Sequence, residues 1–183
     1  MLFRSNERSP LPTQRWLFDL LVIAGVVLVA GFFRLWRLDQ TPPGLGYDEA
    51  AYGHLTLQLL QGKLVLAYEL GVLHSYLAAP FVALLGRVPL ALRLPEALAG
   101  IGAAVMLYLY VREAFVSRLA AVLAALVYAV TFEAVHVSRL AFPSNTLPLV
   151  QAATFYFFWR GWRRKEHGGG RWSLAISGLF LGL

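Results

Sequence analysis

The sequence predicts an all-α protein: a multi-span bundle of transmembrane helices, with interfacial helices in the first outer loop. Hydrophobic residues make up 58% of the 183 residues, charged residues make up only 14%, and the mean hydropathy is +0.62. A soluble domain carries about 25% charged residues, so polar side chains are too few here to coat a water-soluble globule. Long apolar runs also alternate with short basic clusters, as in proteins that cross a bilayer.

The first apolar run covers residues 17–33. At 1.5 Å per residue a helix of this length reaches about 25 Å, near the lower limit for crossing a bilayer. A small-x-small cleavage site is not evident, so we expect an uncleaved span rather than a signal peptide. Further spans are expected at residues 94–111, 119–137, 146–159 and 172–183.

A further apolar run, residues 70–85, is interrupted by glycine, proline and polar residues. Basic residues collect on the cytoplasmic side of membrane proteins, and they decide whether this run crosses. If it does not cross and the N-terminus is cytoplasmic, ten of the 16 lysines and arginines lie inside, including the cluster at 160–171. If it crosses, that cluster lies outside. We therefore expect an outer loop over 34–93 with interfacial helices at 48–61 and 70–85.

Charge and cysteine content exclude several classes of protein. The net charge of +6 and the pI of about 10 are compatible with nucleic-acid binding, but the basic residues lie between apolar runs, so we expect no nucleic-acid partner. Cysteine is absent, which excludes a thiol nucleophile and cysteine-ligated metal within these residues. The run at 172–183 stops without a polar cap, so we expect the N-terminal part of one longer transmembrane domain, inactive by itself. The expected location is the cell membrane.

The first outer loop begins with a distinctive segment: residues 41–53 read TPPGLGYDEAAYG. Its prolines and glycines predict a stiff, bent lead-in to a helix. Asp48 and Glu49 then begin a short helix just outside the membrane, with Tyr52 one turn from Asp48. Asp48 has two interpretations at this point. It is either the N-cap, with Glu49 complementing the helix dipole, or a general base that takes a proton from an acceptor hydroxyl.

The Pro-Pro-Gly-Leu lead-in and the Asp-Glu-Ala-x-Tyr-Gly motif resemble the first outer loop of a superfamily of integral-membrane glycosyltransferases. Its members include protein O-mannosyltransferases and the transferases that add aminoarabinose to lipid A. Residues 85–100, 110–115 and 136–143 are similar, in the same order, to the start of the second span, the inner turn and the second outer loop of this superfamily. The resemblance implies transfer of a hexose or pentose from a polyprenyl-phosphate donor to a lipid, glycan or protein acceptor on the extracytoplasmic face.

The resemblance also implies roles for individual residues. Asp48 occupies the place of the superfamily's essential aspartate, which makes Asp48 the catalytic base, with Glu49 beside it in the catalytic pair and Tyr52 positioning the substrate. The leaving group is a lipid phosphate, so cations are needed on the outer side. Arg93 and Arg139 lie at the outer ends of expected spans and are the candidate phosphate ligands; snorkelling toward lipid headgroups is the alternative.

Some features depart from the superfamily pattern. The Lys or Glu that precedes a Pro-Leu step is replaced here by a stretch that contains Glu69 and His74, whose roles stay unassigned, and the second outer loop lacks an acid. The sequence therefore implies no definite cofactor and leaves a divalent metal as an open alternative. Glu133 and His136 lie three residues apart in an apolar run, either as a functional site or as a mutually satisfied pair. The rival functions are a transporter subunit and a non-catalytic membrane assembly partner.

Overall fold

The computed structural model describes residues 12–64, 66, 72–165 and 170–182, and all regular secondary structure in this part of the chain is helical. This confirms the predicted all-α class. Glu69, residues 70–71 and residue 183 lie outside the described residues. The elements in chain order are α1 (Pro12–Leu35), α2 (Tyr47–Leu60), α3 (Leu73–Leu85), α4 (Pro89–Phe115), α5 (Arg118–Val130), α6 (Phe132–Val137), the 3₁₀ turn η1 (Pro143–Thr146), α7 (Leu147–Lys165) and α8 (Arg171–Leu181).

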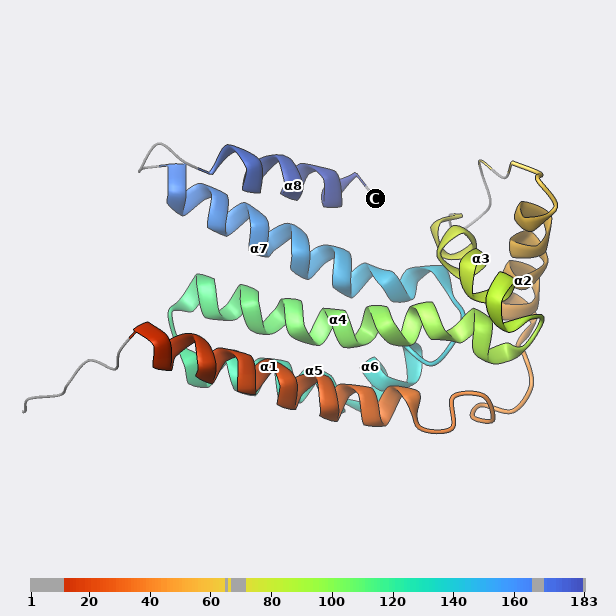
Figure 1. Cartoon of the computed structure of the whole chain (residues 1–183), viewed down its shortest axis with the longest axis horizontal. Helices are drawn as coiled ribbons and strands as arrows, with labels where there is room; N and C mark the ends of the chain where they lie inside the picture. The colour runs from red at the N-terminus through yellow and green to blue at the C-terminus, as the bar shows by residue number, and fades with distance from the viewer. Residues whose placement is uncertain (1–11, 65, 67–71, 166–169, 183) are drawn as a thin grey trace, which may run out of the picture.

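Helices α1, α4, α5, α7 and α8 run alongside one another, and α2 and α3 lie across one end of the bundle (Figure 1). Helix α4 is central and contacts α1, α5 and α7, while α8 packs on α7. Helices α2 and α3 lie across the end where α1 finishes and α4 begins. The connection from α1 to α4 and the connection from α5 to α7 therefore meet at one end of the bundle, which we call the loop end.

The apolar surface of α1 faces away from the protein. Its segment Trp16–Leu35 is long and apolar enough to cross a membrane, yet only 11% of the apolar window is buried in the structure. Helix α4 passes the same test with 50% buried, and α3 and α5 are apolar but shorter. A core helix of a soluble protein would bury most of its apolar surface, so the exposure of α1 indicates a lipid environment. Together with the helical fold, this gives an all-α membrane bundle.

Small residues bring α1, α4 and α5 into close contact. Ala121, Ala125 and Ala129 recur every four residues on α5 and are fully buried, facing Ala30 of α1 and Ala104 of α4. Small side chains allow helix backbones to approach closely where the surrounding lipid is as apolar as a protein core. The core of the bundle is therefore a contact between small side chains, and larger apolar side chains remain on the outer surface.

The helix predicted over residues 119–137 is two helices in the structure. Helix α5 ends at Val130 and α6 begins at Phe132, because Thr131 has an extended backbone with φ −59° and ψ 126°. The Thr131 hydroxyl donates to the Val127 carbonyl at 2.6 Å, a local hydrogen bond that competes with continued helix. Glu133 consequently lies exposed in the first turn of α6 at the loop end.

His136, the residue that the sequence pairs with Glu133, contacts Phe132 in the structure. The His136 ring stacks on the Phe132 ring, with centroids 5.5 Å apart and an interplanar angle of 6°. At the opposite end of the bundle, Asp19 of α1 is also paired. Asp19 accepts a hydrogen bond from the Tyr108 hydroxyl at 2.6 Å and lies 3.8 Å from the guanidinium of Arg118.

Some helices extend beyond the apolar runs that predicted them. Helix α4 covers Pro89–Phe115 rather than 94–111, and α7 covers Leu147–Lys165 rather than 146–159. Hydropathy marks only the part of a helix that matches a hydrocarbon environment, whereas arginine and lysine continue a helix readily into polar surroundings. Apolar runs therefore underestimate helix length at basic ends.

Gly161 permits the close approach of α7 and α8, and its replacement tests their packing. A Cβ at this position would lie 2.7 Å from the Leu174 Cγ and 3.0 Å from the Leu174 backbone nitrogen. We expect Gly161→Val to lower the free energy of unfolding by about 1–3 kcal/mol through overpacking. Gly178→Val on α8 is the control, because a Cβ there meets nothing within 4 Å. Equal thermal stabilities for the two variants in detergent would contradict this packing.

Candidate functional site

The start of α2 determines which of its two acids is free. The N-cap of α2 is Gly46, with an extended backbone, and the carboxylate of Glu49 accepts a hydrogen bond from the Gly46 N–H at 3.0 Å. This is the glutamate half of a capping box. The N-cap interpretation of Asp48 is therefore wrong, because Asp48 is the second residue of the helix. Its side chain is exposed and forms no ion pair or hydrogen bond with the residues that the structure describes.

Glu49 is buried and forms a bidentate ion pair with Arg93 of α4. The Arg93 Nε donates to Glu49 Oε1 at 2.8 Å, and the Arg93 Nη2 donates to Oε2 at 2.9 Å. The same carboxylate accepts from the Ala141 N–H at 2.9 Å, so it links α2 to the segment after α6. Burial by itself raises the pKa of Glu49, but hydrogen bonds from Arg93, Ala141 and Gly46 outweigh burial and leave the pKa below its ordinary value.

Arg93 is fully buried and uses every donor of its guanidinium. Besides the two bonds to Glu49, it donates to the carbonyl of Pro42 at 2.7 Å, to that of Gly44, and at 3.5 Å to that of Leu38. A guanidinium has five N–H donors, so none is left for a lipid phosphate. Arg93 therefore stabilises the bent segment before α2 through its carbonyls. This geometry does not support the predicted role of Arg93 as a phosphate ligand.

Arg139 also binds backbone carbonyls instead of lying open to a ligand. It donates to the carbonyls of Phe33 at 2.8 Å, Trp36 at 2.9 Å and Thr41 at 3.0 Å. The last carbonyls of a helix lack partners within that helix, and a cation is favourable at this end of its dipole. Arg139 therefore caps the C-terminal end of α1. Burial, and secondarily the nearby charge of Arg93, lowers the pKa of Arg139.

A third arginine at the loop end behaves in the same way. Arg34, in the last turn of α1, is fully buried and donates to the carbonyls of Ala129 at 2.9 Å and Tyr128 at 3.3 Å, in the last turn of α5. The sequence offers Arg93 and Arg139 as candidate ligands for lipid phosphate, with snorkelling toward headgroups as the alternative. The structure shows that Arg34, Arg93 and Arg139 each bind carbonyls of another segment, which fixes the ends of the helices relative to one another.

Tyr52 lies beneath α2, on the side that packs against the bundle. It is 2% exposed, and its ring meets the rings of His74 and Phe142 edge-on, with centroids 5.8 and 6.3 Å away. Because Asp48 is exposed and Tyr52 is buried, the structure gives Tyr52 a packing position rather than one at the surface beside Asp48. His74 in turn forms a buried pair with Glu96, which the sequence did not predict.

Among the described residues there is no group of three or more His, Asp or Glu side chains placed to hold a metal ion. The acids of the loop end are instead divided between buried pairs and separate exposed positions. What the described residues offer chemically is the exposed carboxylate of Asp48, on a helix that buried groups hold firmly.

The fold and the site define an all-α membrane protein in which helix α2, which carries Asp48, lies across one end of the bundle and is held there by a buried ion pair and hydrogen bonds. The sequence model of the family described as dolichyl-phosphate-mannose-protein mannosyltransferase matches residues 71–183, more than half of the chain. The chain belongs to this family, which is one of membrane glycosyltransferases that use polyprenyl-phosphate sugar donors. The match includes α3 to α8 but not α2, which carries Asp48. Neither the curated proteins nor the solved structures give a significant match.

Removing one partner of the buried ion pair should destabilise the loop end. We expect Glu49→Gln to cost about 3–5 kcal/mol, because it leaves the charge of Arg93 buried and incompletely compensated. The matched control is Glu133→Gln, an exposed acid at the same end, for which we expect a change within about 0.5 kcal/mol. Thermal unfolding of the detergent-solubilised protein measures both. A Glu49→Gln variant as stable as the control would show that the pair contributes nothing.

The lowered pKa of Glu49 also gives a prediction for the dependence of stability on pH. A carboxyl whose pKa is depressed in the folded state contributes stability above its unfolded-state pKa, about 4.3, and loses it as the pH falls through the folded value. The wild-type protein should therefore lose stability on acidification below about pH 4.3 more steeply than Glu49→Gln does. Parallel pH profiles of the melting temperature would contradict the ion pair as the cause.

Proposed function

We propose that this protein takes part in transferring a sugar from a polyprenyl-phosphate donor to an acceptor hydroxyl or amine on the extracytoplasmic face of the cell membrane. The acceptor classes that fit are lipids, glycans and proteins. In this proposal the chain crosses the membrane several times, the N-terminus is cytoplasmic and the loop end is extracytoplasmic. Family membership supports the chemistry, and the distribution of basic residues supports the orientation.

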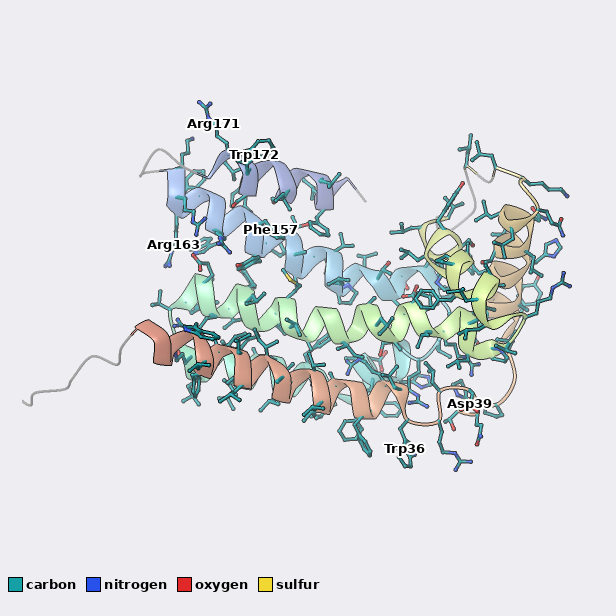
Figure 2. All side chains as sticks on the ribbon, viewed as in Figure 1. Trp36, Asp39, Phe157, Arg163, Arg171 and Trp172 are labelled. Atoms are coloured by element: carbon teal, nitrogen blue, oxygen red, sulfur yellow. The ribbon has the colours of Figure 1, made fainter. Side chains whose placement is uncertain are left out.

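Two ends of different character support this orientation. Arg163, Arg171 and Trp172 lie at the end of the bundle opposite Trp36 and Asp39 (Figure 2). The basic end also contains Arg112, close to Asp19. Basic residues at this end should remain in the cytoplasm, which leaves α2 and α3 facing the other compartment. Polyprenyl-phosphate sugars can then reach Asp48 from within the bilayer while the acceptor approaches from the aqueous side.

The observation that carries the proposal is the contrast between two adjacent acids. Glu49 is buried in an ion pair and fixes α2, whereas Asp48 projects from the same turn without a partner in the described structure. As a general base, Asp48 takes the proton of the acceptor O–H or N–H while the acceptor atom forms a bond to the anomeric carbon. The bond from that carbon to the phosphate oxygen breaks, and polyprenyl phosphate leaves with the electron pair.

The remaining predicted site residues receive supporting roles in this proposal. Glu49 and Arg93 join α2 to α4, and Tyr52 packs α2 against His74 of α3 and against Phe142. Arg139 caps α1. These residues therefore fix the position of Asp48 without touching the substrate. Precise placement of a catalytic group contributes strongly to rate, because a displacement of about 1 Å can cost on the order of 10²-fold. We therefore assign Glu49 a positioning role, in place of the predicted catalytic role.

Replacing Asp48 tests the base directly. In the complete protein, reconstituted in bilayers with a radiolabelled polyprenyl-phosphate sugar, we expect Asp48→Asn to lower the turnover number by about 10²- to 10⁴-fold. Because Asp48 is exposed, thermal stability should change little. Glu133→Gln is the matched control and should retain activity. Full turnover by Asp48→Asn would show that Asp48 is not the base. If the wild-type protein transfers sugar from none of the polyprenyl-phosphate donors, the proposed function is wrong.

The orientation has its own test, because the 183 residues contain no cysteine. Tyr47 is 90% exposed at the loop end, and Arg164 is exposed at the basic end of α7. In intact cells, and in a background without other cysteines, a membrane-impermeant maleimide should label Tyr47→Cys but not Arg164→Cys. After permeabilisation both should react. Labelling of Tyr47→Cys only after permeabilisation would place the loop end in the cytoplasm and contradict the proposal.

A further inference from the structure

Helix α4 carries a second buried ionisable side chain one turn beyond Arg93. Glu96 is fully buried, and its Oε1 lies 2.5 Å from the Nδ1 of His74, which is also fully buried, on α3. Arg93 and Glu96 therefore lie three residues apart on α4 and pair with side chains of two different crosswise helices. Glu49 of α2 pairs with Arg93, and His74 of α3 pairs with Glu96.

The His74–Glu96 pair is a costly way to attach one helix to another. The second ring nitrogen of His74 and the second carboxylate oxygen of Glu96 are buried and have no hydrogen-bond partner among the described residues. Buried polar atoms without partners reduce stability, and apolar residues of similar volume often replace a buried ion pair without loss. Attachment of α3 to α4 would be served as well by apolar packing, so the pair calls for an explanation beyond stability.

The contacts of His74 lead toward Asp48. The ring of His74 meets the ring of Tyr52 edge-on, and the hydroxyl of the next residue, Ser75, lies 3.4 Å from the Tyr52 carbonyl oxygen. Tyr52 is one turn along α2 from Asp48, so the orientation of His74 constrains the helix that carries Asp48. A hydrogen-bonded pair fixes the ring angle of a histidine, whereas apolar packing would leave that angle less defined.

We propose that His74 and Glu96 form a positioning pair for the transfer reaction, which sets the orientation of α2 and so of the Asp48 carboxylate. The proposal rests on the proposed role of Asp48. It differs from the contribution of Glu49 and Arg93, because the His74–Glu96 pair does not include a residue of α2 and acts on that helix through Tyr52 and Ser75. Two pairs on one turn of α4 then restrain α2 from two sides.

The kinetic test uses the complete protein in bilayers and three variants. These are Glu96→Gln, His74→Gln, and the apolar double variant His74→Leu/Glu96→Leu, which keeps α3 packed if a single replacement prevents folding. We expect each folded variant to lower kcat by on the order of 10²-fold, while KM for the donor stays within about twofold because the donor-binding groups are untouched. Glu133→Gln is the control that should keep both constants. Wild-type kcat in the apolar double variant would overturn the proposal, because packing alone would then be sufficient.

A distance measurement separates this proposal from the role of Asp48. Nitroxide labels at Tyr47→Cys on α2 and at Leu98→Cys on α4, both exposed positions, report how α2 sits on α4 by pulsed electron paramagnetic resonance. We expect a narrow distance distribution with the native pair and a broader or shifted one in the apolar double variant. An unchanged distribution would overturn the positioning pair. This readout holds whether or not Asp48→Asn retains turnover, so failure of the base and failure of the positioning pair are distinguishable.

Discussion

The loop end depends on the binding of arginine side chains to backbone carbonyls. Helices α1 and α5 end there, and the bent segment before α2 contributes further carbonyls that cannot pair within a helix. Arg34, Arg93 and Arg139 supply the missing donors, each from a different segment of the chain. A planar guanidinium with five donors can serve several carbonyls at once, so three side chains fix the relative positions of segments that are distant in sequence.

This arrangement gives two neighbouring acids, Asp48 and Glu49, different environments. Successive residues of an α-helix point about 100° apart, so when Glu49 turns into the bundle to meet Arg93, Asp48 points elsewhere. The capping role also falls to Glu49, which reaches back to the Gly46 N–H. Asp48 is thereby left with neither a capping nor an ion-pairing duty in the described structure. A reactive carboxylate requires this combination of a fixed backbone and an unoccupied side chain.

The sequence predicted the class of fold well because hydropathy acts over whole helices. The apolar run at 17–33 falls within α1, and the basic clusters separate one end of the bundle from the other. The end of α5 at Thr131 was missed, because a single extended residue inside an apolar run leaves the hydropathy pattern unchanged. Local composition predicts the length of a helix and its apolar face, but it does not predict where a single backbone torsion departs from helical values.

The site was harder to predict because its contacts join distant residues. Asp48 and Glu49 were singled out, but the division of roles between them depends on Arg93, 44 residues away along the chain. Arg93 and Arg139 looked like free cations because their carbonyl partners leave no mark in the sequence. In the sequence, His74 lies in the stretch that replaces a family feature, and Glu96 lies within a predicted apolar span. An ionisable residue within an apolar span indicates that a partner exists, although it does not identify the partner.

The order of the two pairs along α4 also determines which crosswise helix binds at which position. Arg93 pairs with Glu49 of α2, and Glu96 pairs with His74 of α3. If the two crosswise helices exchanged places, Glu49 would face Glu96 and His74 would face Arg93, which would bury a pair of carboxylates and leave the guanidinium without its partner. Such an arrangement is penalised far more than a loss of apolar contact would be. The order of the two pairs along α4 therefore selects one placement of α2, and with it one direction for the exposed carboxylate of Asp48.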